Sequence, residues 1–492
     1  MSIRRSIVVS VFGRYAGLAI QVAGAIVLAR LISPAEFGIY GIAVAVVYFP
    51  SVVREFGISN YLIQLPRLTR EDLGRAVGLV ASISAVGLTG LLLVRGWVAE
   101  LYGEPRLADL IGIASISFAL MPFGIGTIVT LQRELRFPLL TGTALIATLT
   151  SVIGGVWLAY KGWGAYSLAW AQVLTVATNL TILGCLRPKE LICLPKFSGW
   201  GSMVGFGFFS TLASISGQVQ SSLVSMLVGH RLGFAAVGTL DRANGTLQYL
   251  GRDLLGAMMT VLYVGLAQAK ANPRELEWFT GRAVAQVTAL LVPAYAMVAV
   301  LADPIILTLF GEAWHGVVPL VPVLALGGAA WSFAAVHNRG LQALGRTRET
   351  CVVACTTHAL VLASVAIVLP WGLRSVVWAN TGGAFVWMLG TIFVAHRAIG
   401  IRWRGLLLTA AQALVLSAAA AIPAYLVLHF GVQQLGRLGV LIVGGTAGGI
   451  AWCLAAFLCR HPIAGEVRRV GSYMLQRVGW RKKAGSDNAP GQ

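Results

Sequence analysis

Apolar residues in this chain gather in long runs that are separated by short polar segments. A helix needs roughly 20 apolar residues to cross about 30 Å of hydrocarbon, because its backbone polar groups must be satisfied within the segment. Fourteen runs reach this length. They lie at approximately 8–31, 37–62, 76–98, 107–131, 139–159, 163–186, 202–228, 235–267, 283–302, 317–336, 350–369, 373–395, 406–430 and 438–458. The pattern predicts an all-α integral membrane protein with about fourteen transmembrane helices.

Landmarks between these runs recur in the same order after about 200 residues, which is the trace of an internal duplication. Each unit holds six runs, so both units enter the membrane in the same direction. We therefore expect two parallel six-helix lobes around a central cleft, related by a pseudo-two-fold axis along the membrane normal. The matching landmarks are Phe37-Gly38 with Val237-Gly238, Leu101–Glu104 with Leu309–Glu312, Leu131-Gln132 with Leu341-Gln342, and Trp163-Gly164, Ser167 and Trp170 with Trp371-Gly372, Ser375 and Trp378.

The duplication also divides the chain into predicted domains. The two lobes cover residues 1–195 and 200–400, and an extra helix pair follows at 405–459. Residues 460–483 place apolar side chains on one helical face among many arginines, which predicts a basic interfacial helix, and 484–492 is expected to be a disordered tail. The repeated LxGE and WGxxSxxW segments lie at run ends, where glycine turns the chain and tryptophan anchors at the interface. We interpret them as structural.

Composition and charge agree with a bilayer environment. Hydrophobic residues make up 57% of the chain and charged residues 11%, which excludes a water-soluble globule. Of the 37 lysines and arginines, 26 lie in the N-terminus, the even-numbered loops and the tail, whereas 7 lie in the odd-numbered loops. The positive-inside rule then predicts that both termini are cytoplasmic. The net charge of +19 is thus explained without a nucleic-acid partner, and the partners expected first are membrane lipids.

Catalytic and cofactor motifs are absent from the sequence. It contains no GxxxxGK[ST] phosphate loop, no HExxH pair and no GxSxG elbow, and the seven histidines are scattered. The six cysteines lie in apolar runs or at cytoplasmic ends without a paired CxxC spacing, so we expect neither disulfides nor zinc. We therefore expect no cofactor, no metal and no enzymatic activity.

A few charged residues lie at membrane depth, where such side chains are costly and usually face a protein or water-filled interior. The arginines outnumber the acids by four to three, which suits a diphosphate because guanidinium groups bind phosphate bidentately. Neighbouring polar residues are candidates for sugar contacts, and the acids for ion coupling or ion pairs. The candidate sets are Arg14, Arg54, Arg242 and Arg252 for the diphosphate, Gln21, Gln248 and Tyr249 for the sugar, and Glu55, Asp241 and Asp253 for the ion.

Helical spacing puts some of these residues on common faces. Arg14 and Gln21 fall within about 40° of each other on the first run. On the eighth run Asp241, Gln248 and Arg252 share one face. The other candidates of this run lie on the adjacent face, rotated by roughly 100° about the helix axis; they are Arg242, Tyr249 and Asp253. An alternative interpretation stays open: Arg14 extends its charge to the interface, and the eighth-run charges neutralise one another as buried ion pairs.

The opening of the chain resembles a known family. The segments LARLISPAEFGIY at 28–40 and REFGISNYLIQ at 54–64 look like the start of Wzx-type polysaccharide exporters, especially the colanic-acid and exopolysaccharide branch of the multidrug/oligosaccharidyl-lipid/polysaccharide superfamily. The resemblance implies a flippase in the bacterial inner membrane that moves undecaprenyl-diphosphate-linked oligosaccharide by alternating access. It further implies a cationic cavity with arginines on spans one, two and eight, which correspond by position to Arg14, Arg54 and Arg242 or Arg252. Polysaccharide polymerase and co-polymerase proteins are the implied protein partners.

Two other functions remain as alternatives. A cation-coupled multidrug exporter of the same superfamily would share the architecture, but such proteins usually carry an acidic residue in the first lobe's membrane core, where the first run here has only Arg14. A polysaccharide polymerase or ligase would be expected to have a long external loop and no six-span duplication.

Overall fold

The computed structural model describes residues 3–54, 58–65, 67–188, 195–197, 200, 208–248, 265, 272–401, 403–465 and 468, and the regular elements in these ranges are all helices. Span 37–62 covers two helices and spans 202–228 and 235–267 extend outside the described residues, so the predicted spans match only in part the observed helices. The observed helices are α1 (Ile3–Leu31), α2 (Pro34–Arg54), α3 (Ile58–Gln64), α4 (Arg70–Tyr102), α5 (Arg106–Leu120), η1 (Met121–Gly124), α6 (Ile125–Arg133), α7 (Phe137–Tyr160), α8 (Ala165–Leu186), α11 (Phe208–Leu232), α12 (Phe234–Gln248), α14 (Pro273–Val300), α15 (Ala302–Leu309), η3 (Glu312–Val317), α16 (Val321–Ala343), α17 (Thr347–Val368), η4 (Leu369–Trp371), α18 (Leu373–Ile399) and α19 (Trp403–Leu458).

Ten helical segments in the described ranges are long and apolar enough to cross a membrane. The predicted all-α membrane fold is therefore confirmed. The segment α5–η1–α6 counts as one of the ten, and α19 supplies two because Gly436, with φ 64° and ψ 172°, interrupts it. Helices α2, α11, α12 and α16 are not among the ten, so the total of fourteen spans stays a prediction.

Helix ends follow local sequence signals. Thr69 caps α4 with its side chain and forms a capping box with Asp72, which satisfies two backbone donors that the first turn leaves open. The same helix ends at Gly103, whose φ of 63° lies in the left-handed region that glycine adopts without strain. The predicted turn function of the LxGE glycine is thus seen directly.

Corresponding positions of the two predicted repeats share their backbone conformation. Gly103 and Gly311 both have positive φ, as do Gly164 and Gly372. The turn after α6 provides a further pair, because Leu135 with φ 56° lies 210 residues before Gly345 with φ 79°. The backbone hydrogen bonds agree as well: Leu135 N–H donates to Gln132 and Gly345 N–H to Gln342. These likenesses support the duplication, while the lobe boundaries stay a prediction.

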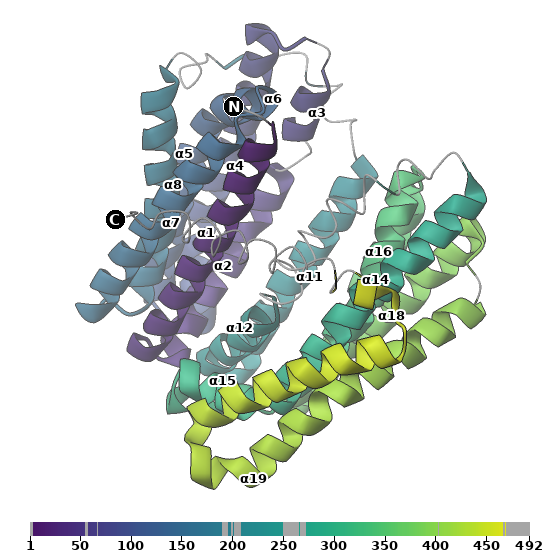
Figure 1. Cartoon of the computed structure of the whole chain (residues 1–492). Coiled ribbons are helices and arrows are strands. Elements are labelled where there is room, and N and C mark those ends of the chain that lie inside the picture. Colours follow the sequence, from purple (N-terminus) through teal and green to yellow (C-terminus); the bar gives the residue numbers. More distant parts are fainter. Residues whose placement is uncertain are drawn as a thin grey trace, which may run out of the picture. The chain divides into compact units, whose positions relative to one another are not determined.

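The described chain forms two compact units. The first contains residues 1–243, 309–320 and 347–383. Its helices α1, α7 and α8 pack side by side, as do α4, α5 and α8 (Figure 1). Short helix α3 packs on α4 and α6 through a cluster that includes Leu62, Ala76 and Val129. Contacts between buried apolar side chains of this kind determine which helices of the unit are neighbours.

The second unit contains residues 244–308, 321–346 and 384–492. Both halves of α19 pack on α14, because Leu416 and Ala456, which lie on either side of Gly436, share a buried cluster with Ala289. Trp452 adds a hydrogen bond of 2.8 Å from its indole N–H to the Ala289 carbonyl. Residues 460–465 and 468 continue the chain beyond α19, and the rest of the predicted interfacial helix and tail lies outside the described residues.

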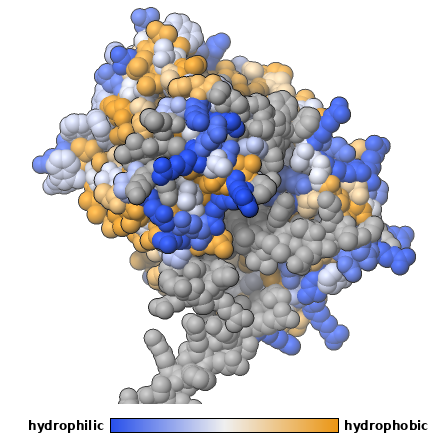
Figure 2. All heavy atoms as spheres, turned by 90° about the horizontal axis from the view of Figure 1, so that it is seen from above, coloured by the Kyte–Doolittle hydropathy of each residue, from blue (hydrophilic) through white to orange (hydrophobic). Residues whose placement is uncertain are grey.

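Hydrophilic and hydrophobic side chains are unevenly distributed over the surface. Seen from above in Figure 2, hydrophilic side chains lie among hydrophobic ones on the described part of the surface. Elsewhere large apolar side chains are exposed on helix flanks, for example Leu93 on α4 and Ile153 on α7. Exposed apolar flanks are expected where lipid replaces water.

Candidate functional site

The polar stripe predicted on α1 is present and accessible. Arg14 and Gln21 are both exposed. Helix α1 packs on α7 through its glycines, because side chains at Gly13 and Gly24 would meet Thr141 and Val152. Close packing through small residues leaves the polar stripe beside this interface and not under it. Arg14 is therefore exposed beside the α1–α7 interface, and its predicted ligand contact stays a prediction.

The described candidates on α12 differ in their surroundings. Asp241 and Gln248 are exposed, whereas Arg242 is half-buried. A Cβ atom at Gly41 of α2 would lie 2.5 Å from the Asp241 carboxylate, so the glycine leaves room for this side chain. Helix α12 thus exposes Asp241 and Gln248, whereas Arg242 is half-buried.

Several predicted residues cannot be placed in the same way. Arg54 is the last residue of α2. Glu55, Tyr249, Arg252 and Asp253 lie outside the described residues. Their predicted functions stay predictions.

The Arg242 guanidinium lies among three aromatic rings. Its Cζ atom is 4.5 Å from the centroid of Phe37, 4.7 Å from that of Phe310 and 4.7 Å from that of Trp314. Phe37 and Trp314 meet edge to face, with centroids 5.3 Å apart. Cation–π contacts of this kind are strongest when they are desolvated. Arg242 is therefore engaged by aromatic side chains from α2, from η3 and from the segment that leads into η3.

Around this aromatic cage, two helical hairpins contact each other. One is the turn between α1 and α2 and the other the turn between α11 and α12; we call their meeting the hairpin contact. A side chain at Gly38 would collide with the Phe234 carbonyl, and one at Gly238 with the Pro34 carbonyl. The contact is therefore reciprocal, and the paired residues are 200 apart, which is the shift of the duplication. Glycine is required at both positions because backbone meets backbone there.

Further hydrogen bonds close the same region. The Trp314 indole donates to the Ala29 carbonyl over 2.8 Å, and Trp314 is 1% exposed. The Arg30 guanidinium donates to the Leu309 carbonyl over 3.1 Å. The Tyr102 hydroxyl donates to the Met226 carbonyl over 2.8 Å. These bonds join α1 and α4 to the later segments of the first unit.

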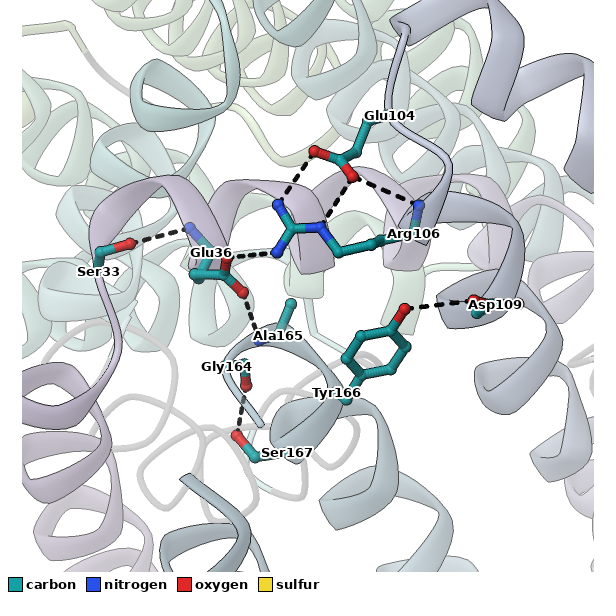
Figure 3. A network of polar contacts seen from close by, with 9 residues as sticks. All are labelled: Ser33, Glu36, Glu104, Arg106, Asp109, Gly164, Ala165, Tyr166 and Ser167. Carbon is teal, nitrogen blue, oxygen red and sulfur yellow. Dashed lines mark hydrogen bonds and ion pairs between the residues drawn. The ribbon is translucent and has the colours of Figure 1, made fainter. Parts of the chain in front are cut away.

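A polar network ties the first-repeat helices together beside the hairpin contact (Figure 3). The Glu36 carboxylate accepts from Arg106 over 2.6 Å and from the Ala165 backbone N–H over 2.7 Å. Arg106 also donates to Glu104 over 2.8 Å. This hydrogen bond holds the pKa of the Glu104 carboxyl below its usual value. Glu36 thus joins α2 to the start of α8 and, through Arg106, to the turn between α4 and α5.

The sequence interpretation missed this network. Glu36 entered only as part of the resemblance and Arg106 only as one of the outer basic residues. Their positions next to helix starts were the available signal, because an acid there favours the helix N-terminus. The pairing itself joins residues 70 apart in the chain, which spacing alone does not predict.

Two parts of α1 therefore differ in how tightly they are packed. Near Ala29, which is 3% exposed and accepts the Trp314 hydrogen bond, the helix enters the hairpin contact, whereas Arg14 is exposed. Fifteen residues separate Ala29 from Arg14, which is about 22 Å of helix. The same helix thus has a tightly packed segment and an exposed arginine at different levels.

Comparison with known protein families bears on this arrangement. The family model described as polysaccharide biosynthesis protein matches residues 27–319, more than half of the chain. The chain belongs to this family. The match covers both segments on which the resemblance rested, so the predicted family relation is confirmed.

Curated relatives agree with the family. The chain is 22% identical to the lipopolysaccharide biosynthesis protein WzxC of Escherichia coli, over 90% of this chain and 91% of the relative. It is 23% identical to the succinoglycan biosynthesis transport protein ExoT of Rhizobium meliloti, over 89% of each. A membrane protein from the cps region of Klebsiella pneumoniae is 23% identical, and the match spans 63% of its length, less than two thirds.

Solved structures agree with the fold. The lipid II flippase MurJ in an inward closed conformation superposes with a TM-score of 0.69 at 15% identity, covering 93% of this chain and 99% of MurJ. A multidrug resistance MATE transporter in an inward-facing conformation gives 0.58 at 14% identity, covering 78% of this chain and 94% of the transporter. This family member is therefore a multi-pass membrane protein with a transporter fold.

Proposed function

We propose that this protein exports undecaprenyl-diphosphate-linked oligosaccharide repeat units from the cytoplasmic to the outer leaflet of the bacterial inner membrane. The units supply surface or extracellular polysaccharide synthesis. The protein works by alternating access and not as an enzyme, and both termini lie in the cytoplasm. Polysaccharide polymerase and co-polymerase proteins then receive its product.

The observation that carries the proposal is the contrast along α1. Arg14 is exposed within a helix that otherwise has the length and apolarity of a membrane span. A cation retained at membrane depth is costly unless water or a ligand meets it. The hairpin contact closes the other end of the same helix. An exposed arginine below a closed end suits a ligand that enters with its diphosphate from one side only.

The chemistry of the candidates fits such a ligand. In the proposal Arg14, Arg54 and Arg252 hold the diphosphate, since guanidinium groups bind phosphate oxygens bidentately. Gln21, Gln248 and Tyr249 contact the sugars, and the lipid tail stays in the bilayer. Glu55, Asp241 and Asp253 balance charge or couple an ion.

Arg242 has a different part in this cycle. It joins the diphosphate site only after the hairpin contact opens and its aromatic cage separates. Until then its charge is engaged by Phe37, Phe310 and Trp314. Opening of the hairpin contact thus increases the number of arginines that can bind the diphosphate.

Transport measurements on paired arginine variants test the proposal. Each charge-assisted contact contributes about 1.5–3 kcal/mol, so the double variant Arg14→Ala with Arg252→Ala should nearly stop export. Lipid-linked oligosaccharide should then stay inaccessible to an impermeant glycan-modifying enzyme added outside spheroplasts. Replacement of both by lysine keeps the charge and should retain partial export.

The matched control is Arg374→Ala, which removes an exposed arginine at the start of α18. It should export normally. All variants are compared at equal abundance in the membrane. Normal export by the double alanine variant would refute the proposed site.

A further inference from the structure

A pocket of about 480 Å³ opens between α4, α5 and α8 in the first unit. It is separate from the Arg14 stripe on α1 and from the hairpin contact. Charged, aromatic and small side chains all contribute to its wall. The lining residues are Arg95, Asp109, Gly112, Ile113, Ile116, Trp163, Tyr166 and Trp170.

Arg95 supplies the positive charge of this pocket. It lies inside α4, which continues to Tyr102. Its guanidinium reaches over α5 at Gly112, where a Cβ atom would lie 3.0 Å from the Arg95 Nη1. Within the described part of the chain Arg95 has no ion-pair partner. The arginine is therefore available to a ligand.

Asp109 supplies a negative charge that does not neutralise Arg95. It is exposed and accepts a hydrogen bond of 3.3 Å from the Tyr166 hydroxyl (Figure 3). No ion pair joins Asp109 to a described basic residue. The pocket thus holds one cation and one anion apart, with Trp163, Tyr166 and Trp170 beside them.

Ile116, which lines the pocket, is 37% exposed, and α4 also carries the exposed apolar side chains of Leu93 and Trp97, at 78% and 61%. Such side chains are stable when acyl chains cover them. Tryptophan and tyrosine are typical of the headgroup level of a bilayer. The occupant of the pocket should therefore come from the membrane and not from water.

The second repeat has neither the arginine nor the acid at the equivalent positions; an acid stands in place of Arg95 and an apolar residue in place of Asp109. At the shift of 208 residues Arg95 corresponds to Asp303 and Asp109 to Val317, whereas Trp163 and Trp170 correspond to Trp371 and Trp378. The tryptophans are thus explained by a structural role that both repeats share. The charges need a separate explanation.

We propose that this pocket binds the phosphoethanolamine headgroup of a membrane phospholipid. The phosphodiester lies on Arg95, because guanidinium groups form charge-assisted bonds with phosphate oxygens. The primary ammonium donates hydrogen bonds to the Asp109 carboxylate, which the trimethylammonium group of phosphatidylcholine cannot do, and it lies beside the aromatic rings, which attract cations over their faces. A headgroup with one negative and one positive charge matches a pocket that holds the two opposite charges apart. A purely anionic headgroup would meet Asp109 without compensation.

Native mass spectrometry of the purified full-length protein tests this assignment. After delipidation, equimolar phosphatidylethanolamine, phosphatidylglycerol and phosphatidylcholine are added and retained lipids are counted. The protein should retain phosphatidylethanolamine in preference to both others. Arg95→Gln should weaken this retention about tenfold, as expected for one charge-assisted contact, and Arg95→Lys should weaken it less. Asp109→Asn should remove the preference over phosphatidylglycerol.

Arg374→Gln is the matched control, since it removes an exposed arginine beside the corresponding tryptophans of the second repeat. It should retain phosphatidylethanolamine like the unsubstituted protein. Equal retention of the three lipids, or unchanged retention in Arg95→Gln, would overturn the assignment. A preference for phosphatidylglycerol would instead identify an anionic-lipid site and would equally overturn it. Lipid retention is read without transport, so the result is independent of the proposed export.

Discussion

Leu135 adopts a backbone conformation that costs energy for its residue type. Its φ of 56° lies in the left-handed region, where a side chain crowds the following carbonyl. The turn is held by backbone bonds from Leu135 to Gln132 and from Arg136 to Leu131. Gly345 occupies the equivalent turn of the second repeat with the same bonds and without a side chain. The first repeat therefore carries strain that the second avoids.

Exchanging these two residue types should have opposite effects on stability. Leu135→Gly relieves the strain and removes a side chain that is 58% exposed, so it should stabilise the protein by about 1 kcal/mol. Gly345→Leu imposes the same strain and should destabilise it by a similar amount. Thermal unfolding of the two purified variants measures both. Shifts of the same sign in the two variants would contradict the equivalence of the turns.

The aromatic partners of Arg242 could not be predicted from the sequence. Helical spacing identified Arg242 as a charge at membrane depth. It could not identify the partners, because Phe37 and Trp314 are 205 and 72 residues away in the chain. Tertiary contacts over such separations leave no periodic signal. The exposure of Arg14 also required the structure, since its helical face was predicted but not what covers it.

At the scale of elements, the hairpin contact depends on two glycines. Gly38 and Gly238 each lie against a carbonyl of the opposite turn, so a methyl group at either position forces the backbones apart. Backbone contacts of this kind cannot be relieved by a rotamer change. The closed state of this region should therefore be unusually sensitive to Gly→Ala.

Gly38→Ala and Gly238→Ala should each open the hairpin contact. Val237 is fully buried, so a cysteine placed there reports opening by its reaction with an impermeant maleimide. In a background without the native cysteines, each variant should raise the labelling rate about tenfold or more, which corresponds to about 1.4 kcal/mol of lost closure.

Gly90→Ala serves as the control, because nothing lies within 4 Å of its Cβ position on α4. It should leave the labelling of the Val237 cysteine unchanged. Equal labelling rates in all three glycine variants would show that the contact does not hold this region closed.

Element positions were predicted well, and the reason is physical. Runs of apolar residues must become helices in a bilayer, so α7 and α17 follow their predicted ranges closely, and α4 extends beyond its predicted range at both ends. The packing of those helices was not predicted. The polar residues that fix it, such as Glu36 and Arg106, act between distant turns, and many sequences with the same apolar runs could pack differently. Gly38 and Gly238 were recognised only as landmarks of the duplication, and the structure shows that both lie at a close backbone approach.

At the scale of the whole molecule, the orientation in the membrane rests on charge. Basic residues resist translocation, and 26 of the 37 lie on the side predicted to be cytoplasmic. The predicted orientation follows from this charge asymmetry. The turns that carry Lys161 and Ala313 should then lie outside the cell membrane and the turn that carries Arg348 inside.

Single cysteines at these three positions test the orientation directly. Lys161, Ala313 and Arg348 are exposed, and they avoid the positive-φ glycines of the same turns, where any side chain would add strain. In intact spheroplasts, impermeant maleimide should label the cysteines at 161 and 313 and should label the one at 348 only after permeabilisation. The inverse pattern would reverse the topology and with it the direction of export. A cysteine at 348 labelled from both sides would instead show that the chain inserts in two orientations.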